Sequence, residues 1–154
     1  MATGIGKPED LALAGLFHDV ALVDFPYEGE DFSPEEMAGW SDQVRKQYLE
    51  HPLHSTRVLK GRRMTIPAEI SNIIEQHHER ADGRGFPKQL PSFKIRPEAG
   101  LLHLADQVEI LRQPRQGKRR YSLEGALDAI EKSQAISPEV IWKVKKAVVR
   151  GKGS

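Results

Sequence analysis

The chain contains no cysteine and has no long apolar run. Without a thiol, disulfides and thiolate metal ligands are excluded, and any metal must be held by imidazole and carboxylate groups. No apolar run approaches the ~20 residues that span a bilayer, and the N-terminus lacks the basic-then-apolar pattern of a signal peptide. We therefore expect a soluble cytoplasmic protein with no membrane partner.

Neither basic nor acidic residues predominate in the sequence. The 154 residues include 23 Lys and Arg against 22 Asp and Glu, a formal charge of +1, which argues against a nucleic-acid polymer as partner. The length suits a single domain over residues 1–154. One local basic cluster could be an anion site or a solvated face; it comprises Arg112, Arg115, Lys118, Arg119 and Arg120.

Proline, serine and acidic residues mark the expected helix starts. Proline suits the first helical position, serine the cap and acids the first turn. Helices are expected to begin near residues 8, 33, 51, 67, 97, 122 and 137, with an interruption near residue 39. The first is apolar nearly all round, which predicts burial. No useful segment alternates with period two, so the fold class is all-α with few or no strands.

Several of the six histidines stand close to carboxylate residues in the sequence. The histidines are His18, His51, His54, His77, His78 and His103. Asp19 directly follows His18, and Asp106 lies one turn after His103. A single such histidine is more often a hydrogen-bonded core residue than a ligand. The set lies at expected helix ends and on inward faces, which favours metal-dependent hydrolysis.

Two motifs resemble those of a known family. His18-Asp19 resembles the His-Asp signature of the HD superfamily of phosphohydrolases. Residues 77–87, His-His-Glu-Arg-Ala-Asp-Gly-Arg-Gly-Phe-Pro, are similar to the HD-GYP signature, which ends in Gly-Tyr-Pro. Residues 51–52, 105–106 and 137–140 match further blocks in the same order. The chain is thus identified as a divergent HD-GYP member, which implies an HD-type helical bundle.

The resemblance implies an activity and cofactors. HD-GYP domains hydrolyse the bacterial second messenger cyclic di-GMP with two divalent metal ions, most often iron or manganese, by a hydroxide activated between the metals. Asp19 would bridge the two ions and is the expected catalytic residue. The expected metal ligands are His18, Asp19, His51, His77, His78 and Asp106.

The resemblance also implies substrate contacts and partners. The substrate would be cyclic di-GMP or a related phosphodiester, and a sensory or diguanylate cyclase domain is an expected partner. Two basic family residues that follow the Ala-Asp pair map onto the cluster after Asp106. The expected substrate-binding residues are Arg80, Asp82, Gly85, Phe86, Arg115 and Lys118.

Several positions depart from the family pattern. Leu22 stands where the family has a phosphate-contacting lysine, and Phe86 lacks the tyrosine hydroxyl. The family's first helix, with a further ligand, has no counterpart before His18; we hypothesise that His103 partly compensates. Two alternatives therefore stay open. One is a weakly active or inactive domain that binds metal and serves as a cyclic di-GMP receptor or protein-interaction module. The other is an HD hydrolase of a different phosphate substrate.

Overall fold

The computed structural model describes residues 3–26, 37–113 and 120–151, and these contain helices and no strand. The all-α prediction is confirmed. The described helices are α1 (Pro8–Phe17), η1 (Val20–Leu22), α3 (Asp42–Gly61), α4 (Ala68–Gln76), η2 (Ser92–Lys94), α5 (Pro97–Arg112), α6 (Leu123–Ser133) and α7 (Pro138–Gly151).

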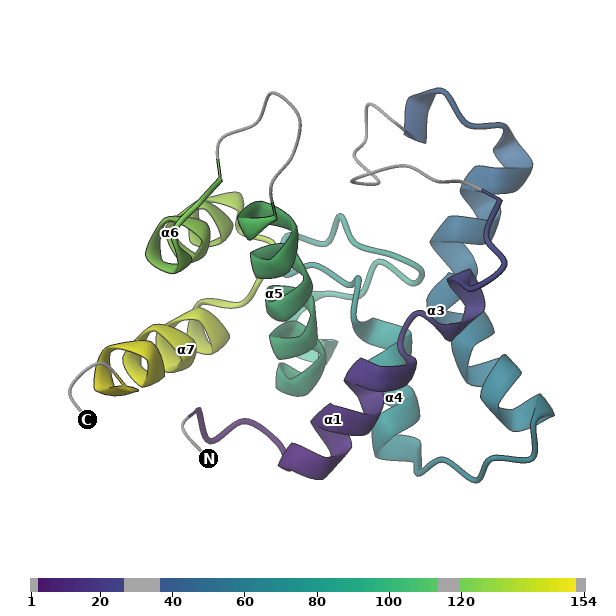
Figure 1. Cartoon of the computed structure of the whole chain (residues 1–154), viewed down its shortest axis with the longest axis horizontal. Coiled ribbons are helices and arrows are strands. Elements are labelled where there is room, and N and C mark those ends of the chain that lie inside the picture. Colours follow the sequence, from purple (N-terminus) through teal and green to yellow (C-terminus); the bar gives the residue numbers. More distant parts are fainter. Residues whose placement is uncertain (1–2, 27–36, 114–119, 152–154) are drawn as a thin grey trace.

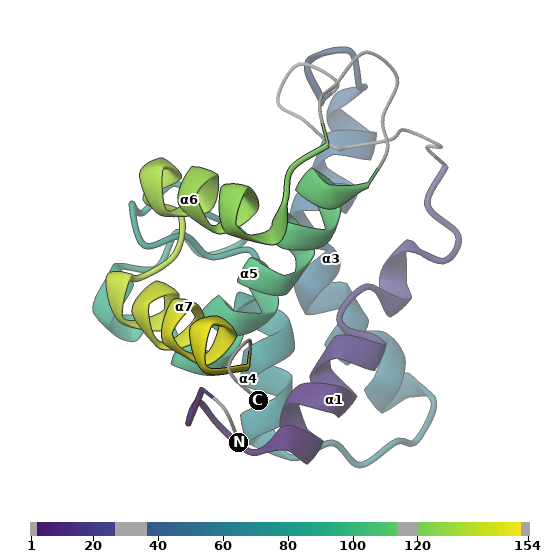
Figure 2. The ribbon, with the colours of Figure 1, turned by 60° about the vertical axis from the view of Figure 1, so that its left-hand side comes forward.

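Helices α4 and α5 lie at the centre of the bundle. Helices α1 and α3 pack against α4 on one side, whereas α6 and α7 pack against α5 on the other (Figures 1 and 2). The core accordingly has two parts. One lies among α1, α3, α4 and α5 around Ile70, Ile73 and Ile74. The other lies among α5, α6 and α7 around Leu104 and Leu127. The end of α4 lies where the two sides of the bundle meet.

Most expected helix starts agree with the structure. Pro8, Pro97 and Pro138 are the first residues of α1, α5 and α7. Ser122 caps α6, and its hydroxyl accepts a hydrogen bond from the Gly125 backbone N–H at 3.1 Å. The start expected near residue 33 lies outside the described residues.

Helix α3 corrects one prediction. The expected new helix at residues 51–52 is wrong, because α3 runs unbroken from Asp42 to Gly61 with Pro52 inside it. Proline lacks the N–H that would bond to the Tyr48 carbonyl, four residues earlier. The Nδ1–H of His51 donates to that carbonyl instead, at 2.5 Å. The helix therefore continues with its free acceptor satisfied.

Helix α1 corrects a second prediction. Its apolar sequence predicted burial, yet Ala14 alone among its residues is buried, and Leu13 and Leu16 are 44% and 71% exposed. The helix lies at the edge of the bundle and contacts α4 and α5 (Figure 1). Apolar character does not specify how many neighbours a helix has, so this part of the prediction was wrong.

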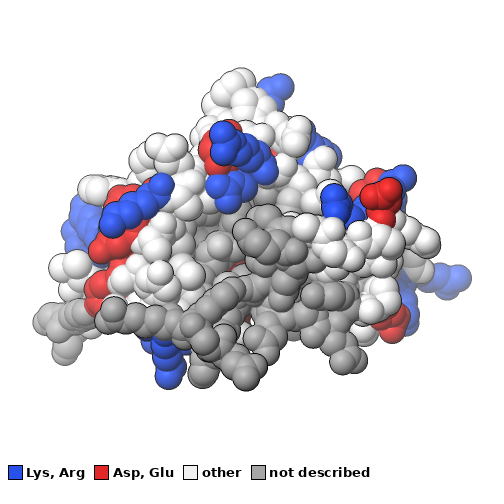
Figure 3. Space-filling model, turned by 90° about the horizontal axis from the view of Figure 1, so that it is seen from above, with Lys and Arg blue, Asp and Glu red and all other residues white. Residues whose placement is uncertain are grey.

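The charges on the surface are mixed, as the balanced composition predicts. On the face shown in Figure 3, acidic side chains lie beside basic ones in several places. No extended area of one charge is visible there among the described residues. No described helix is long and apolar enough to cross a membrane.

Candidate metal centre

Four segments bring the six expected metal ligands together. They are the end of α1, the middle of α3, the end of α4 and the middle of α5. Two groups form, and within each group one ligand atom per residue lies within 4.8 Å of the others. The first group comprises Asp19, His51, His77 and His78, and the second comprises His18, His77 and Asp106.

The Asp19 carboxylate connects the two groups. Its Oδ1 lies 3.1 Å from His51 Nε2 and 3.4 Å from His77 Nε2. Its Oδ2 lies 3.3 Å from His18 Nε2, which is 3.5 Å from Asp106 Oδ1. Each oxygen of one carboxylate thus faces a different set of imidazoles.

Backbone carbonyls set the orientation of three rings. The Nδ1 atoms of His18, His51 and His77 lie 2.8, 2.5 and 2.6 Å from the carbonyl oxygen three residues earlier. A carbonyl only accepts, so Nδ1 carries the proton in each ring. In the neutral ring Nε2 then has a free lone pair, and such second-shell bonds orient metal-binding histidines. All three Nε2 atoms face Asp19.

The ligand atoms around Asp19 are suited to a bound cation. Asp19 Oδ1 is buried and accepts no hydrogen bond, although 45% of the whole side chain is exposed. A buried carboxylate oxygen without a hydrogen bond is costly unless a cation occupies the space before it. Imidazole nitrogen and carboxylate oxygen without thiolate suit divalent ions such as iron, manganese or zinc. The six residues could hold such ions.

Electrostatics favour an ionised Asp19 carboxylate, neutral rings at His51 and His78, and a protonated ring at His18. Burial lowers the pKa of His51 and holds the pKa of His78 well below its usual value. Burial also acts to lower the pKa of His18, but Asp106 and Asp19 outweigh it and raise this pKa to about 10. For Asp19, burial would raise the pKa, but three neighbouring histidines hold it far below its usual range.

The Gly-Phe-Pro segment packs against the metal-binding histidines. The Phe86 ring stacks on His78 with centroids 4.5 Å apart, and the Phe86 N–H donates to the His78 carbonyl at 3.1 Å. Gly85 is buried, and a Cβ there would collide with the backbone of His78, Glu79 and Arg80. Only glycine fits this close approach. Substrate contact by Gly85 and Phe86 stays a prediction.

Glu79 supports the loop beside the site, a role that the sequence analysis did not assign to it. Its carboxylate is buried and accepts from the Lys88 and Leu90 N–H groups at 2.7 and 2.8 Å. Its carbonyl accepts from His103 Nδ1 at 3.2 Å. Glu79 therefore ties the loop to the end of α4. Neither ligand group among the described residues includes His103, so its geometry does not support the hypothesis of a compensating ligand.

Arg80 and Asp82 bond to each other. Arg80 Nη2 donates to Asp82 Oδ2 at 2.6 Å and approaches the Ser133 carbonyl at 3.4 Å. The adjacent Ala81 N–H donates to the Ala135 carbonyl at 2.7 Å. These contacts join the loop after α4 to the connection between α6 and α7. Their expected role in substrate binding stays a prediction, and the expected contacts at residues 115 and 118 lie outside the described residues.

Aromatic side chains form a wall beside the centre, and of these only Phe86 belongs to a sequence motif. Phe25 and Trp40 have centroids 5.6 Å apart, and Tyr48 lies 5.5 Å from both Trp40 and Phe86. The Tyr48 ring is also 5.1 Å from the His51 ring. Burial raises the pKa of Tyr48, so it stays a neutral phenol. The wall shields one side of the imidazoles from water.

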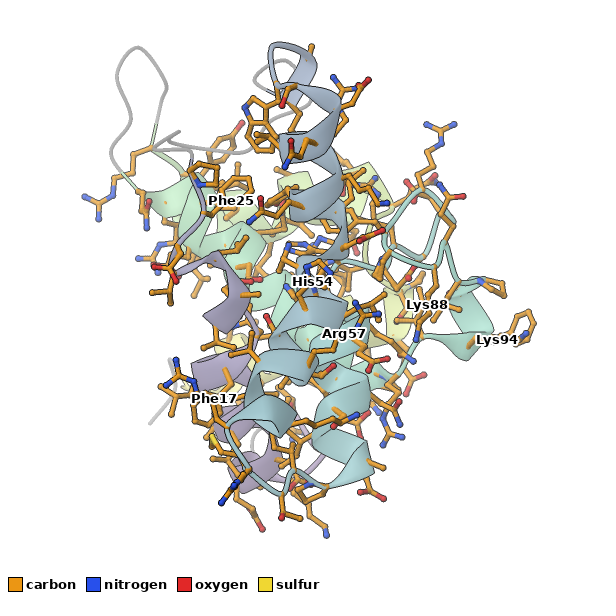
Figure 4. The ribbon with its side chains drawn as sticks, turned by 90° about the vertical axis from the view of Figure 1, so that its right-hand side faces the viewer. Phe17, Phe25, His54, Arg57, Lys88 and Lys94 are labelled. Carbon is orange, nitrogen blue, oxygen red and sulfur yellow. The ribbon has the colours of Figure 1, made fainter. Side chains whose placement is uncertain are left out.

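His54 belongs to neither group. It is on α3, three residues after His51, and its Nε2 lies 3.6 Å from Glu50 Oε2 with 34% of the side chain exposed (Figure 4). The two histidines of one helix thus differ sharply in surroundings, and the difference makes His54 a natural control for His51.

Comparisons with known proteins identify the family. The HD domain family matches residues 6–140, so the chain belongs to the HD domain family. Its fold is similar to that of Bd1817, a HDG"Y"P protein from Bdellovibrio bacteriovorus, with a TM-score of 0.65 and 19% identity. The match covers 92% of this chain and 44% of that chain, so this chain spans less than half of its length. No curated protein matches. The predicted HD domain and helical bundle are confirmed. Assignment to the HD-GYP type stays a prediction.

Proposed function

We propose that this chain is a metal-dependent phosphodiesterase that hydrolyses cyclic di-GMP. The HD domains are a family of metal-dependent phosphohydrolases, and the HD-GYP type implies a phosphodiester substrate. One observation carries the proposal furthest: one oxygen of Asp19 faces His51 and His77, and its other oxygen faces His18. A carboxylate shared in this way is suited to two neighbouring cations.

Each residue has a role in the proposed centre. One divalent ion would be held by His51, His77 and His78 and the other by His18 and Asp106, with Asp19 shared. When bound, two such ions activate water and neutralise charge on the phosphoryl group. Iron or manganese fits this donor set.

The chain itself prepares the site for that chemistry. The pKa of Asp19 is held far below its usual range, so this carboxylate stays ionised at neutral pH. Backbone carbonyls keep the Nε2 atoms of His18, His51 and His77 directed at it. Phe86 and Tyr48 exclude water from one side, which strengthens the electrostatic interactions there.

A second function is favoured by Leu22. This residue lies in η1, three positions after Asp19, where the family has a lysine. A charge-assisted contact to phosphate contributes roughly 1.5–3 kcal/mol, which leucine cannot supply. The alternative is therefore a domain that binds metal and cyclic di-GMP but hydrolyses it slowly. Such a receptor would act through a sensory or diguanylate cyclase domain as partner.

The test is turnover of cyclic di-GMP by manganese-loaded protein, with products separated by chromatography. The proposal expects linear dinucleotide or GMP from the unaltered chain and none from D19N. Binding of the nucleotide without product would favour the receptor. Neither binding nor product from a metal-loaded sample would contradict both. The Leu22→Lys variant should bind the nucleotide about ten- to hundredfold more tightly in either case.

A further inference from the structure

We propose that Ser55 is a positioning residue for the metal centre, because its hydroxyl anchors the turn that carries Asp19. The proposal rests on the proposed metal site and adds a residue outside the ligand set. Ser55 is fully buried on α3. It would act through Asp19 and would touch neither metal nor substrate.

Asp19 needs an anchor from outside its own helix. Helix α1 ends at Phe17, His18 is its C-cap, and Asp19 has φ −108° and ψ 15°, outside helical geometry. The local bond from the Leu22 N–H to the Asp19 carbonyl, at 2.8 Å, closes the turn but does not attach it to the rest of the bundle. The position of the carboxylate therefore depends on contacts between this turn and α3.

Ser55 supplies such a contact. The Ala21 N–H donates to Ser55 Oγ at 3.2 Å, across 34 positions of sequence. Ser55 follows His51 by four residues, so both side chains lie on one face of α3. The same face thus presents an imidazole 3.1 Å from Asp19 Oδ1 and a hydroxyl that holds the backbone two residues after Asp19.

Replacing the hydroxyl would move the turn. Alanine at position 55 would remove the acceptor of the Ala21 N–H. A buried methyl group would then lie beside that N–H. An amide without its acceptor is costly, so the turn would shift toward another partner or water. Such a shift would displace Asp19 from His51 and His77. Loss of a hydrogen bond made directly to a metal ligand typically weakens metal binding about 10- to 100-fold. Ser55 acts two residues from Asp19, so we expect an effect at the lower end, about tenfold.

Thr56 provides a matched control on the next residue. It is 2% exposed, and its hydroxyl has two acceptors within reach, the Leu53 carbonyl at 3.0 Å and Glu75 Oε1 at 3.2 Å. The variants S55A and T56V therefore each remove one buried hydroxyl from the same turn of α3. Only the first loses a contact to the turn that carries Asp19.

The experiment measures manganese affinity by calorimetry and the visible spectrum of the cobalt-loaded protein, using the whole chain. The proposal expects S55A to bind manganese about tenfold more weakly than the unaltered chain and to show an altered cobalt spectrum. T56V should keep the manganese affinity and the cobalt spectrum of the unaltered chain. S55T, which retains a hydroxyl, should recover most of the manganese affinity. Unchanged affinity in S55A, or equal losses in S55A and T56V, would overturn the proposal.

Two further outcomes are decisive. If the unaltered chain binds no metal, the proposed function fails together with this inference; if it binds metal and S55A matches it, only the inference fails. Should S55A not fold, hydrogen exchange of the Ala21 amide in the unaltered chain tests the same contact. Slow exchange would support it, and exchange at the rate of an exposed amide would overturn it.

Discussion

His51 donates its Nδ1–H to the carbonyl of Tyr48, three residues earlier on α3, at 2.5 Å. In a regular helix that carbonyl would accept from the N–H of residue 52, which is a proline and has none. Pro52 thus leaves free the acceptor that His51 uses. The ring is held with Nε2 toward Asp19, at 3.1 Å.

The first prediction concerns Pro52. Alanine at this position restores an N–H that competes with His51 for the Tyr48 carbonyl, so the ring loses part of its support. We expect P52A to weaken manganese binding about tenfold, as for other second-shell losses. Calorimetric titration measures the manganese affinity. The control is P138A, at the start of α7, which should bind manganese as the unaltered chain does. Normal binding by P52A would contradict this account of the ring.

The second prediction concerns unequal metal positions. The first ligand group has four residues, with His51 and His77 1% and 0% exposed. The second has three, and its His18 and Asp106 side chains are 17% and 21% exposed. We expect two metal-binding steps of different affinity and loss of only the weaker step in D106N. Titration that shows two equal steps in D106N would contradict this.

Part of the fold was predictable from the sequence alone. Helix starts at Pro8, Pro97, Pro138 and Ser122 were predictable because proline and serine act locally at a helix terminus. The same local rule failed at Pro52, where a side chain rather than another backbone group satisfies the freed carbonyl.

The candidate site was predictable only in part. The resemblance pointed to six residues that the fold brings together, because ligands of this kind occur in short motifs. The supporting contacts were not visible in the sequence. Ser55 reaches Ala21 across 34 positions, and the Glu79 carboxylate binds backbone groups of a loop that carry no sequence signature. Such contacts depend on how the helices pack.

A third prediction tests the close packing at Gly85. A Cβ there would overlap the backbone of three consecutive residues, 78 to 80, whereas nothing lies within 4 Å of a Cβ built at Gly61. We expect G85A to lower the free energy of unfolding by about 1–3 kcal/mol. G61A, near the end of α3, should leave it unchanged or raise it by roughly 0.5–1 kcal/mol. Urea unfolding compares them, and equal stability of both variants would contradict the predicted overlap.

A fourth prediction follows from the pair of Arg80 and Asp82. Hydrogen bonding to Arg80 lowers the pKa of Asp82 below its ordinary 3.8. A lowered folded-state pKa stabilises the fold above the unfolded value, and this contribution is lost as pH falls through the folded value. The stability difference between the unaltered chain and D82N should thus be constant near neutral pH and shrink below about pH 4. A difference independent of pH in urea unfolding would rule out this contribution.

The most direct test of the central claim is metal content in the unaltered chain, H51A and H54A, measured by elemental analysis after reconstitution with manganese. His51 and His54 lie on one helix, but only His51 belongs to a ligand group. The account predicts two ions per chain in the unaltered protein and in H54A, and a clear loss in H51A. Equal metal content in H51A and H54A, or no metal in the unaltered chain, would contradict it.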